Sequence, residues 1–245
     1  MMTKNFKISI VTVTKNSEKF LQENIDSLEN QTYKNFEHII VDGASTDKTL
    51  EIIKTNSNKI TKWISEPDQG LYYAMNKGLK LCSGDIVGIL NSDDKYFPEA
   101  LSIVNNYFKR NNIDFLFGSV FKHKLMHGFY PKKIYWTFGF YTTHSVGFFI
   151  NKKSQDRIGL YNTKYKWSAD YDLFYRMIVK KKMKGMATNK MEIFGNFRPG
   201  GLSSKIRYID FLRENNEIRI DNGQNKFIVF CIYILRVLRN FKRLI

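Results

Sequence analysis

The chain predicts an α/β fold in which helices cover both faces of a mostly parallel central sheet. Short, β-branched apolar runs, of which residues 8–13 are the first, are typical of buried strands. The segments that follow these runs carry apolar residues at helical spacing. Strand and helix alternate in this way four times in about ninety residues, a pattern typical of βαβ units and a parallel sheet.

The elements of this half follow in a regular order. After the first strand, Asn16 and Ser17 can cap a helix within residues 17–28. Ser45 or Thr46 can cap the next helix. The other predicted elements are the strands 36–42, 60–65 and 85–90 and the helices 45–57 and 69–82.

The second half of the chain is less regular. Residues 113–123 and 145–153 predict strands. Residues 170–182 predict an amphipathic helix that opens on acids and closes on lysines, which suits the helix dipole. Residues 221–225, with the sequence DNGQN, predict a linker.

We therefore expect one domain over residues 1–221 and a C-terminal amphipathic helical tail over residues 222–245. The tail has no acid beyond its linker, and a basic, apolar helix is typical of an element that lies on an anionic membrane surface. Packing on the domain or on a second copy is the alternative. No stretch reaches the ~20 apolar residues that a membrane span needs.

The charge of the chain favours an anionic partner. Lys and Arg number 39 against 23 Asp and Glu, so the net charge of the 245 residues is +16. Such a balance suits nucleic acid, an anionic membrane or phosphorylated substrates. Cys82 and Cys231 have neither the spacing of a zinc site nor that of a disulfide framework, which fits a reducing cytoplasm.

Polar side chains gather where the predicted strands end, and ligands of such sheets bind at the carboxyl ends of the strands. Asp93 and Asp94 form the sharpest of these groups, because paired carboxylates suit Mg²⁺ or Mn²⁺ shared with a substrate diphosphate. A turn cap before Pro98 is the alternative. The four groups are Thr12 to Asn16, Asp42, Glu66 to Asp68, and Asn91 to Asp94.

Three stretches resemble the family 2 glycosyltransferases with the GT-A fold, and in particular bacterial enzymes that build surface polysaccharides. They are ISIVTVTKNSEKFLQENIDSLENQTYKNFEHIIVDGASTDKT, EPDQGLYYAMNKGL and GILNSDD, within residues 7 to about 110. THSVGFFI, WSADYDLFYRM and GNFRPGGLSS extend the likeness to about residue 204. The resemblance implies a Rossmann-like α/β/α sandwich with a nucleotide-binding half over about 1–110 and an acceptor half over about 111–221.

The resemblance also implies a nucleotide pocket. Asp42, in VDGAST, stands where the family binds the base or ribose, and Thr12 and Thr14 would line the same pocket. Asp68, in EPDQG, would face the nucleotide as well.

Metal and catalytic residues follow from the same likeness. Asp93 and Asp94 stand at the family's DXD-type motif, where Asp94 is the expected metal ligand and Asp93 reaches the ribose or sugar. Asp170, in SADYD, stands where inverting members place the base that takes a proton from the acceptor hydroxyl. Asp172 is its rival, and the two lie about 200° apart on a helix, so only one can face the site.

The chain departs from the family pattern at three positions. Tyr73 stands where close relatives often have an acid, Met75 where the family often has arginine, and Ala169 where many members have glutamate. Two roles are open for His144: a structural one, or contact with the metal, the phosphates or the acceptor. Gly200 and Gly201 predict either a loop that closes over the donor or an ordinary turn.

The expected function is an inverting, metal-dependent transfer of a sugar from a nucleotide diphosphate, by default UDP, to a saccharide or lipid-linked acceptor. The expected place is the cytoplasm, peripheral on the inner membrane. A nucleic-acid-binding protein is the alternative from another class, but no nucleic-acid signature is present. A sugar-phosphate nucleotidyltransferase usually has a glycine-rich turn after the first strand, and here that turn, TVTKNSEK, has no glycine.

Overall fold

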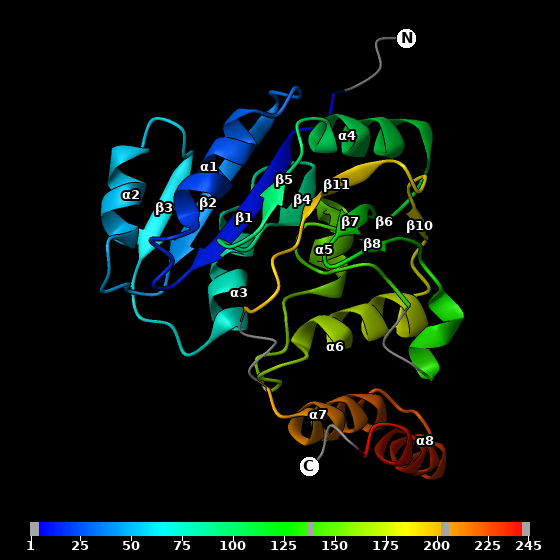
Figure 1. The fold of residues 1–245 in the computed structure, drawn as a ribbon. Helices are drawn as coiled ribbons and strands as arrows, with labels where there is room; N and C mark the ends of the chain where they lie inside the picture. The colour runs from blue at the N-terminus through cyan, green and yellow to red at the C-terminus, as the bar shows by residue number, and fades with distance from the viewer. Residues whose placement is uncertain (1–4, 137–139, 202–205, 242–245) are drawn as a thin grey trace.

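A seven-stranded sheet forms the centre of the protein in the computed structural model, which describes residues 5–136, 140–201 and 206–241. Its order is β10-β6-β9-β4-β1-β2-β3 (Figure 1). Only β9 runs antiparallel to its neighbours, so the predicted, mostly parallel sheet is confirmed. The strands are β1 (Ile8–Thr14), β2 (Phe36–Asp42), β3 (Lys62–Ser65), β4 (Ile86–Ile89), β6 (Phe115–Phe117), β9 (Phe148–Asn151) and β10 (Gly185–Ala187).

Helices cover both faces of this sheet because successive side chains of a strand point to opposite sides. On β1, Val11 and Val13 pack in one core cluster with α3, and Ile8 and Ile10 pack in another with α4. The predicted three-layer arrangement is therefore confirmed. The helices of this half are α1 (Leu21–Glu29), α2 (Thr49–Thr55), α3 (Leu71–Leu81) and α4 (Ala100–Arg110).

A second, four-stranded sheet links the two halves. Its order is β5-β11-β7-β8, and β11 pairs antiparallel with β5 through Gly195 opposite Tyr96. This pairing brings the chain after β11 against the turn that precedes β5. The strands are β5 (Lys95–Tyr96), β7 (Ser119–Phe121), β8 (Leu125–Met126) and β11 (Ile193–Asn196).

The remaining helices lie in the second half. The predicted helix over 170–182 is α6 (Ala169–Tyr175) continued by the π-helix η2 (Arg176–Lys180). The predicted linker separates α7 (Tyr208–Asp221) from α8 (Lys226–Arg239), which lies beyond α7 at the edge of the molecule (Figure 1). The others are α5 (Lys152–Ile158) and the 3-10 helix η1 (Pro131–Tyr135).

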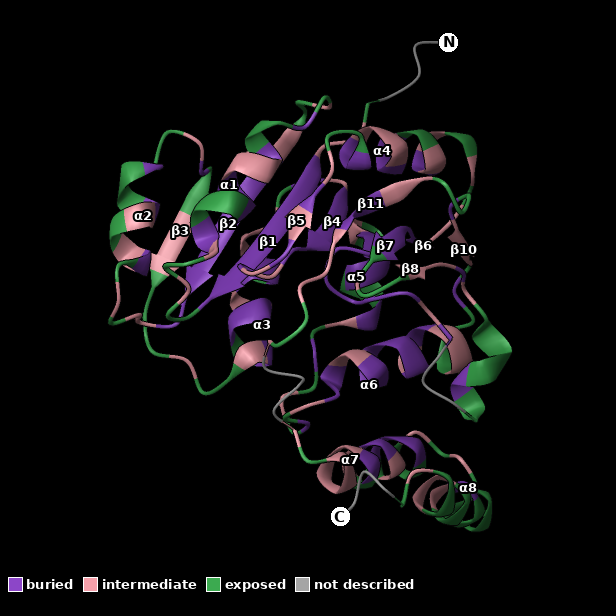
Figure 2. Ribbon diagram, in the orientation of Figure 1, coloured by how far each residue is buried: buried purple, intermediate pink, exposed green. Residues whose placement is uncertain are grey.

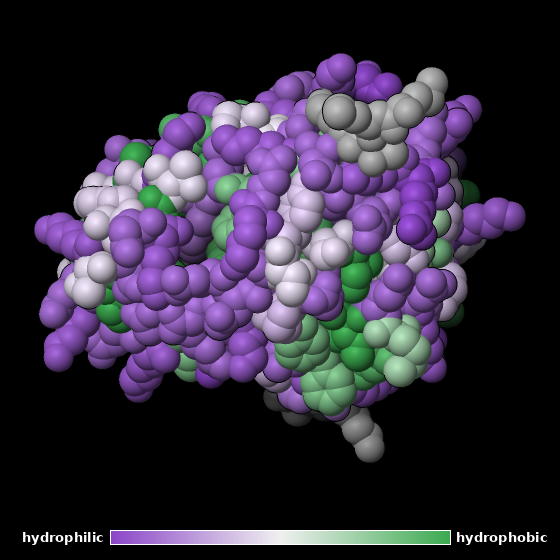
Figure 3. Space-filling view, turned by 90° about the horizontal axis from the view of Figure 1, so that it is seen from above, coloured by the Kyte–Doolittle hydropathy of each residue, from purple (hydrophilic) through white to green (hydrophobic). Residues whose placement is uncertain are grey.

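No helix among the described residues has the length and apolar character needed to cross a membrane. Seen from above in Figure 3, hydrophilic residues cover most of the surface, and hydrophobic ones appear in several places, with the largest group toward the lower right.

Both predicted helix caps in the first half are wrong. α1 begins at Leu21, and the Ser17 hydroxyl instead lies 2.9 Å from the Ser92 hydroxyl. α2 begins at Thr49, and the Ser45 hydroxyl donates to Asp42. Both hydroxyls stabilise the loops at the strand ends, where they bond to neighbouring loops and not to their own helices.

The contact between α3 and β1 yields a stability prediction. A Cβ added at Gly78 would lie 2.2 Å from Val11 Cγ1, so Gly78→Ala overpacks the core. We expect a net loss of roughly 1–2 kcal/mol in unfolding free energy, because overpacking costs about 1–3 and alanine regains about 0.5–1 in a helix. Urea denaturation measures it, with Lys80→Ala on the exposed side of α3 as control. An unchanged midpoint for Gly78→Ala would contradict this packing.

Candidate active site

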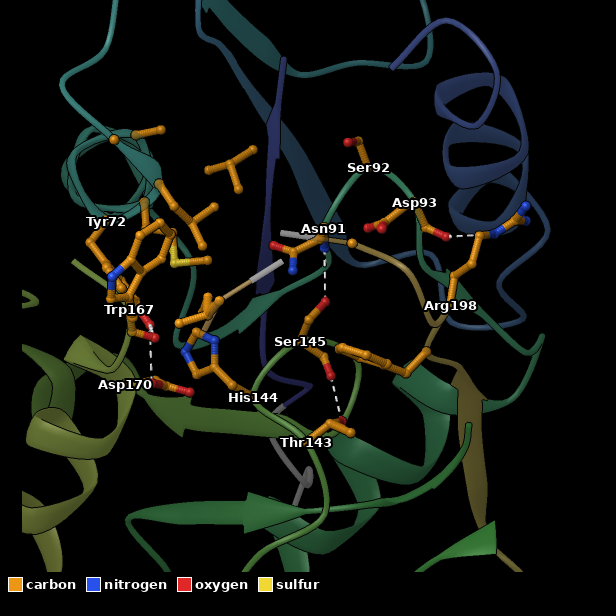
Figure 4. Close-up of a pocket in the computed structure, with 18 of the residues that line it drawn as sticks. Tyr72, Asn91, Ser92, Asp93, Thr143, His144, Ser145, Trp167, Asp170 and Arg198 are labelled. Atoms are coloured by element: carbon orange, nitrogen blue, oxygen red, sulfur yellow. Dashed lines mark hydrogen bonds between the residues drawn. The ribbon is translucent and has the colours of Figure 1, made fainter. Parts of the chain in front are cut away.

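A pocket of about 1430 Å³ opens at the carboxyl ends of the parallel strands. Thr14, Asp42 and Ser65 stand opposite one another at the ends of β1, β2 and β3, so the predicted convergence of polar strand ends is confirmed. In Figure 4, Asp93 and Arg198 lie at one end of the pocket and Asp170 and Trp167 at the other, with Asn91 and His144 between them.

Two adjacent carboxylates form the first end of the pocket. Asp93 lines the pocket, and Asp94 lies behind it with only 3% of its surface exposed. Burial and the charge of Asp93 raise the pKa of Asp94 to about 7, and burial also raises the pKa of Asp93. Both shifts indicate that the surrounding cations do not compensate the two charges.

Segments distant in sequence hold this acidic turn in place. The Ser145 hydroxyl accepts from the Asn91 backbone N–H at 2.9 Å and donates to Asp94 Oδ2 at 2.5 Å. The Arg198 backbone N–H donates to Asp94 Oδ1 at 2.8 Å, and its Nε donates to the Asp93 carbonyl at 3.1 Å. The Arg198 guanidinium also pairs with Glu23 at 2.6 Å.

The acidic turn fits a hard divalent cation. Mg²⁺ and Mn²⁺ are commonly held by one or two carboxylates together with substrate phosphates. Asp93 and Asp94 supply such a pair of carboxylates, and a cation would neutralise their uncompensated negative charge. No group of three or more His, Cys, Asp or Glu suited to a metal occurs among the described residues. The remaining ligands would therefore be diphosphate oxygens and water.

The four predicted nucleotide residues differ in position. Thr14 and Asp68 line the pocket, and the Thr14 hydroxyl has no hydrogen-bond partner among the described residues. Asp68 lies 2.6 Å from the Lys77 ammonium. Thr12 and Asp42 are not among the lining residues.

Thr12 and Asp42 are buried behind the pocket wall. The Thr12 hydroxyl lies 3.0 Å from His38 Nε2. The Asp42 carboxylate accepts from the Ser45 N–H at 3.1 Å and from the Ser65 hydroxyl at 2.7 Å, so it shapes the loop after β2.

The structure separates Asp170 from its rival. Asp170 lines the pocket and accepts from the Tyr72 hydroxyl at 3.0 Å and from the Tyr141 hydroxyl at 3.2 Å. Asp172 is 2% exposed and pairs with Arg176 Nε at 2.8 Å, away from the pocket. Of the two carboxylates, only Asp170 faces the pocket.

His144 lies in the pocket wall between the two acidic ends. Its Nε2 is 2.7 Å from the Tyr161 hydroxyl, and its ring stacks on Phe148. Burial lowers its pKa, which favours the neutral imidazole.

Gly201 passes close to the acidic turn, since a Cβ there would lie 3.0 Å from Asp93 Oδ2, and Gly200 has φ +99°. Residues 202–205 lie outside the described residues.

Positively charged side chains also line the pocket. Among the described lining residues, five carry a positive side chain, which gives part of the large net charge a local role. They are Lys15, Lys122, Lys166, Arg198 and Arg207.

The chain belongs to glycosyl transferase family 2, whose sequence model matches residues 9–179. Escherichia coli WcaA, provisionally named a colanic acid biosynthesis glycosyl transferase, is 26% identical over 252 residues, with 96% of this chain and 90% of WcaA covered.

The name of a second relative includes a sugar donor, UDP-Glc. The Escherichia coli UDP-Glc:alpha-D-GlcNAc-diphosphoundecaprenol beta-1,3-glucosyltransferase WfgD is 29% identical over 116 residues, with 47% of this chain and 46% of WfgD covered. The match spans only 37% of the length of two Mycobacterium tuberculosis relatives.

Solved structures show the same GT-A fold. The mannosyltransferase PcManGT from Pyrobaculum calidifontis, solved with GDP-Man and Mn²⁺, superposes with a TM-score of 0.72 at 17% identity. The superposition covers 99% of this chain and 73% of PcManGT. The predicted fold class is thereby confirmed.

Sequence reasoning missed four residues of the site. Ser145 and Arg198 lie within the stretches THSVGFFI and GNFRPGG, so the resemblance marked their segments but not their contacts. Tyr72 likewise lies within the stretch EPDQGLYYAMNKGL, whereas Tyr141 lies outside every such stretch. The contacts of neither tyrosine had a signal, because tyrosine in apolar surroundings is ordinary core composition.

The two tyrosines yield a prediction for activity. Tyr72→Phe and Tyr141→Phe each remove a hydroxyl that donates to Asp170, and a hydrogen bond to a charged group contributes about 1.5–3 kcal/mol. We expect kcat for sugar transfer to fall roughly tenfold in each variant while the KM for the donor stays unchanged.

Tyr73→Phe, on the same helix but outside the pocket lining, is the matched control. Equal rates for all three variants would show that the hydroxyls do not position Asp170.

Proposed function

We propose that the chain is an inverting, metal-dependent glycosyltransferase that moves a sugar from a nucleotide diphosphate sugar, with uridine as the base, to a saccharide or lipid-linked acceptor hydroxyl. One observation carries the proposal. A single pocket has Asp93, with the buried Asp94 directly behind it, at one end and Asp170, held by two tyrosines, at the other. Donor diphosphate and acceptor hydroxyl would thus each have their own carboxylate.

The reaction follows from this division. The acceptor oxygen forms a bond to the anomeric carbon while the bond from that carbon to the diphosphate oxygen breaks. The diphosphate leaves with the electron pair, and the acceptor proton passes to the Asp170 carboxylate. Attack from the side opposite the leaving group inverts the configuration of the carbon. A bound divalent cation would stabilise the charge that develops on the diphosphate.

The lining residues have matching roles. Thr14 and Asp68 would contact the nucleoside, with Thr12 and Asp42 shaping the wall behind it. Asp94 would bind the metal, and Asp93 would reach the ribose or sugar. Among the lining cations, Lys15, Lys122 and Lys166 favour an anionic donor, whereas Arg198 and Arg207 already pair with Glu23 and Asp210.

The relatives support a role in bacterial surface polysaccharide synthesis. WfgD is named for transfer from UDP-Glc to a sugar on diphosphoundecaprenol, and WcaA for colanic acid biosynthesis. The free thiols Cys82 and Cys231 are compatible with the reducing cytoplasm, where we place the protein. Neither nucleic-acid binding nor nucleotidyl transfer has comparable support.

Asp170 and Asp172 provide a paired test of the base. Asp170→Asn should lower kcat by about 10²–10⁴, because general base catalysis is lost, and leave donor binding intact. Asp172→Asn should lower the melting temperature through its Arg176 ion pair while the folded enzyme keeps its kcat. Product formation followed by NMR gives both the rate and the anomeric configuration. Retained activity in Asp170→Asn, or a product with retained configuration, would rule out this assignment.

Asp94 provides the test of metal dependence. Asp94→Asn should abolish the Mn²⁺-dependent part of sugar transfer, because the buried pair loses one of its two charges. Asp156→Asn, an exposed carboxylate on α5, is the control and should respond to Mn²⁺ as the wild type does. Circular dichroism confirms that the variant is folded. Undiminished transfer by Asp94→Asn would contradict the metal assignment.

A further inference from the structure

The outer side of α8 exposes an apolar stripe. Its large apolar side chains recur at helical spacing on the side that faces away from α7, and Figure 2 shows this side as exposed. Four of them are more than half exposed, which is unusual for one helix of a globular protein. They are Phe227 (74%), Phe230 (59%), Leu235 (66%) and Leu238 (68%), and Phe241 (57%) continues the stripe just beyond the end of the helix.

The inner side of α8 fixes this orientation. Val229 and Ile232 are the buried residues of the helix, at 2% and 5% exposure, and α8 packs along α7. Arg236 donates to the Trp136 carbonyl at 2.8 Å, and Gln224 donates to the Tyr135 carbonyl at 3.2 Å. The stripe therefore points away from the domain because the opposite side of α8 is held against it.

The contacts of Arg236 and Gln224 place η1 beside α8. Tyr130, Tyr135 and Trp136, at the ends of η1, are 48%, 38% and 57% exposed. Lys132 and Lys133 are exposed between them, and the Lys133 ammonium lies 4.2 Å from the Tyr130 ring centre. Exposed tyrosine and tryptophan next to lysine are typical of a protein surface at the membrane interface.

The charge of this surface favours one partner over another. Residues 226–241 contain no acid, and of their three cations Arg236 lies on the inner side, which leaves Lys226 and Arg239 together with the two lysines of η1. A second copy paired through α8 would bring cations against cations, whereas anionic lipid headgroups would complement them.

We propose that α8 and η1 together form a docking face for an anionic lipid bilayer, with the stripe at the boundary of headgroups and acyl chains. Phe211 and Asn215 of α7 line the active-site pocket, while α8 packs along the same helix. The acceptor end of the pocket is then separated from the membrane by α7 and α8, about two helix diameters or ~20 Å. This position suits a lipid-linked acceptor, a conclusion that rests on the proposed function.

Vesicle flotation tests the docking face with the full chain. Phosphatidylcholine vesicles containing phosphatidylglycerol should bind the wild type, pure phosphatidylcholine should bind it less, and added salt should weaken binding. The double variant Leu235→Glu/Leu238→Glu should lose roughly tenfold or more in affinity, because two apolar side chains no longer enter the bilayer. Met191→Glu, at an 82% exposed apolar residue far from α8 in the chain, is the matched control and should bind normally.

Two further measurements separate the remaining outcomes. Sedimentation velocity reports the oligomeric state: a wild-type dimer that Leu235→Glu/Leu238→Glu converts to a monomer, without vesicle binding, would assign the face to a second copy. Equal vesicle binding by that variant and the wild type would overturn the proposal. Titration with UDP and Mn²⁺ on the same samples reports the active site separately, so loss of membrane binding and failure of the proposed function are distinguishable.

Discussion

The burial of two adjacent carboxylates at the end of β4 is the constraint on which the site depends. Like charges this close are unfavourable, and the pKa of Asp94 is raised to about 7 by burial and by Asp93. Ser145, before β9, and Arg198, after β11, hold Asp94 through its two oxygens. The second sheet brings Arg198 there, since β11 pairs with β5 directly after the acidic turn. The two halves of the chain thus meet around a charge that a cation with a diphosphate would neutralise.

Asp170 is set up in a different way. Two tyrosine hydroxyls, from α3 and from the segment before β9, donate to its two oxygens, so its orientation depends on both halves of the chain. A cation would be needed to neutralise Asp93 and Asp94, whereas the Asp170 carboxylate accepts hydrogen bonds from neutral tyrosine hydroxyls. A reaction that needs a cation at the leaving group and a base at the acceptor requires carboxylates in two such different environments.

Most of the first half of the fold was predictable because its signals are local, although α4 was not predicted. Buried parallel strands are short continuous apolar runs, whereas amphipathic helices have apolar residues at helical spacing, and β1, β2 and α3 fall where these two signals place them. α7 was missed because it buries Asn215 and Arg219, so its apolar residues do not mark its inner side. β10 and β11 were missed because three or four residues carry no measurable period. By contrast, the sequence did predict a basic, apolar helix where α8 exposes its stripe.

The candidate site was predictable as far as strand ends determine it. Asp68, Asp93 and Thr14 line the pocket because they follow or end parallel strands. Thr12 and Asp42 come from the same strand ends, but His38 and the loop after β2 occupy their polar atoms. The resemblance chose Asp170 over Asp172, and the i,i+4 spacing of Asp172 and Arg176 is compatible with the ion pair that holds Asp172. That Asp170 faces the pocket and Asp172 does not depends on the packing of α6, which no pattern in the sequence specifies.

Calorimetric titration of the wild-type protein with UDP, with and without Mn²⁺, tests the central claim most directly. The account predicts that UDP binds in the presence of Mn²⁺ and binds far more weakly without it, because the metal joins the diphosphate to Asp93 and Asp94. Equal binding with and without the metal, or no binding of UDP, GDP or TDP under either condition, would contradict it.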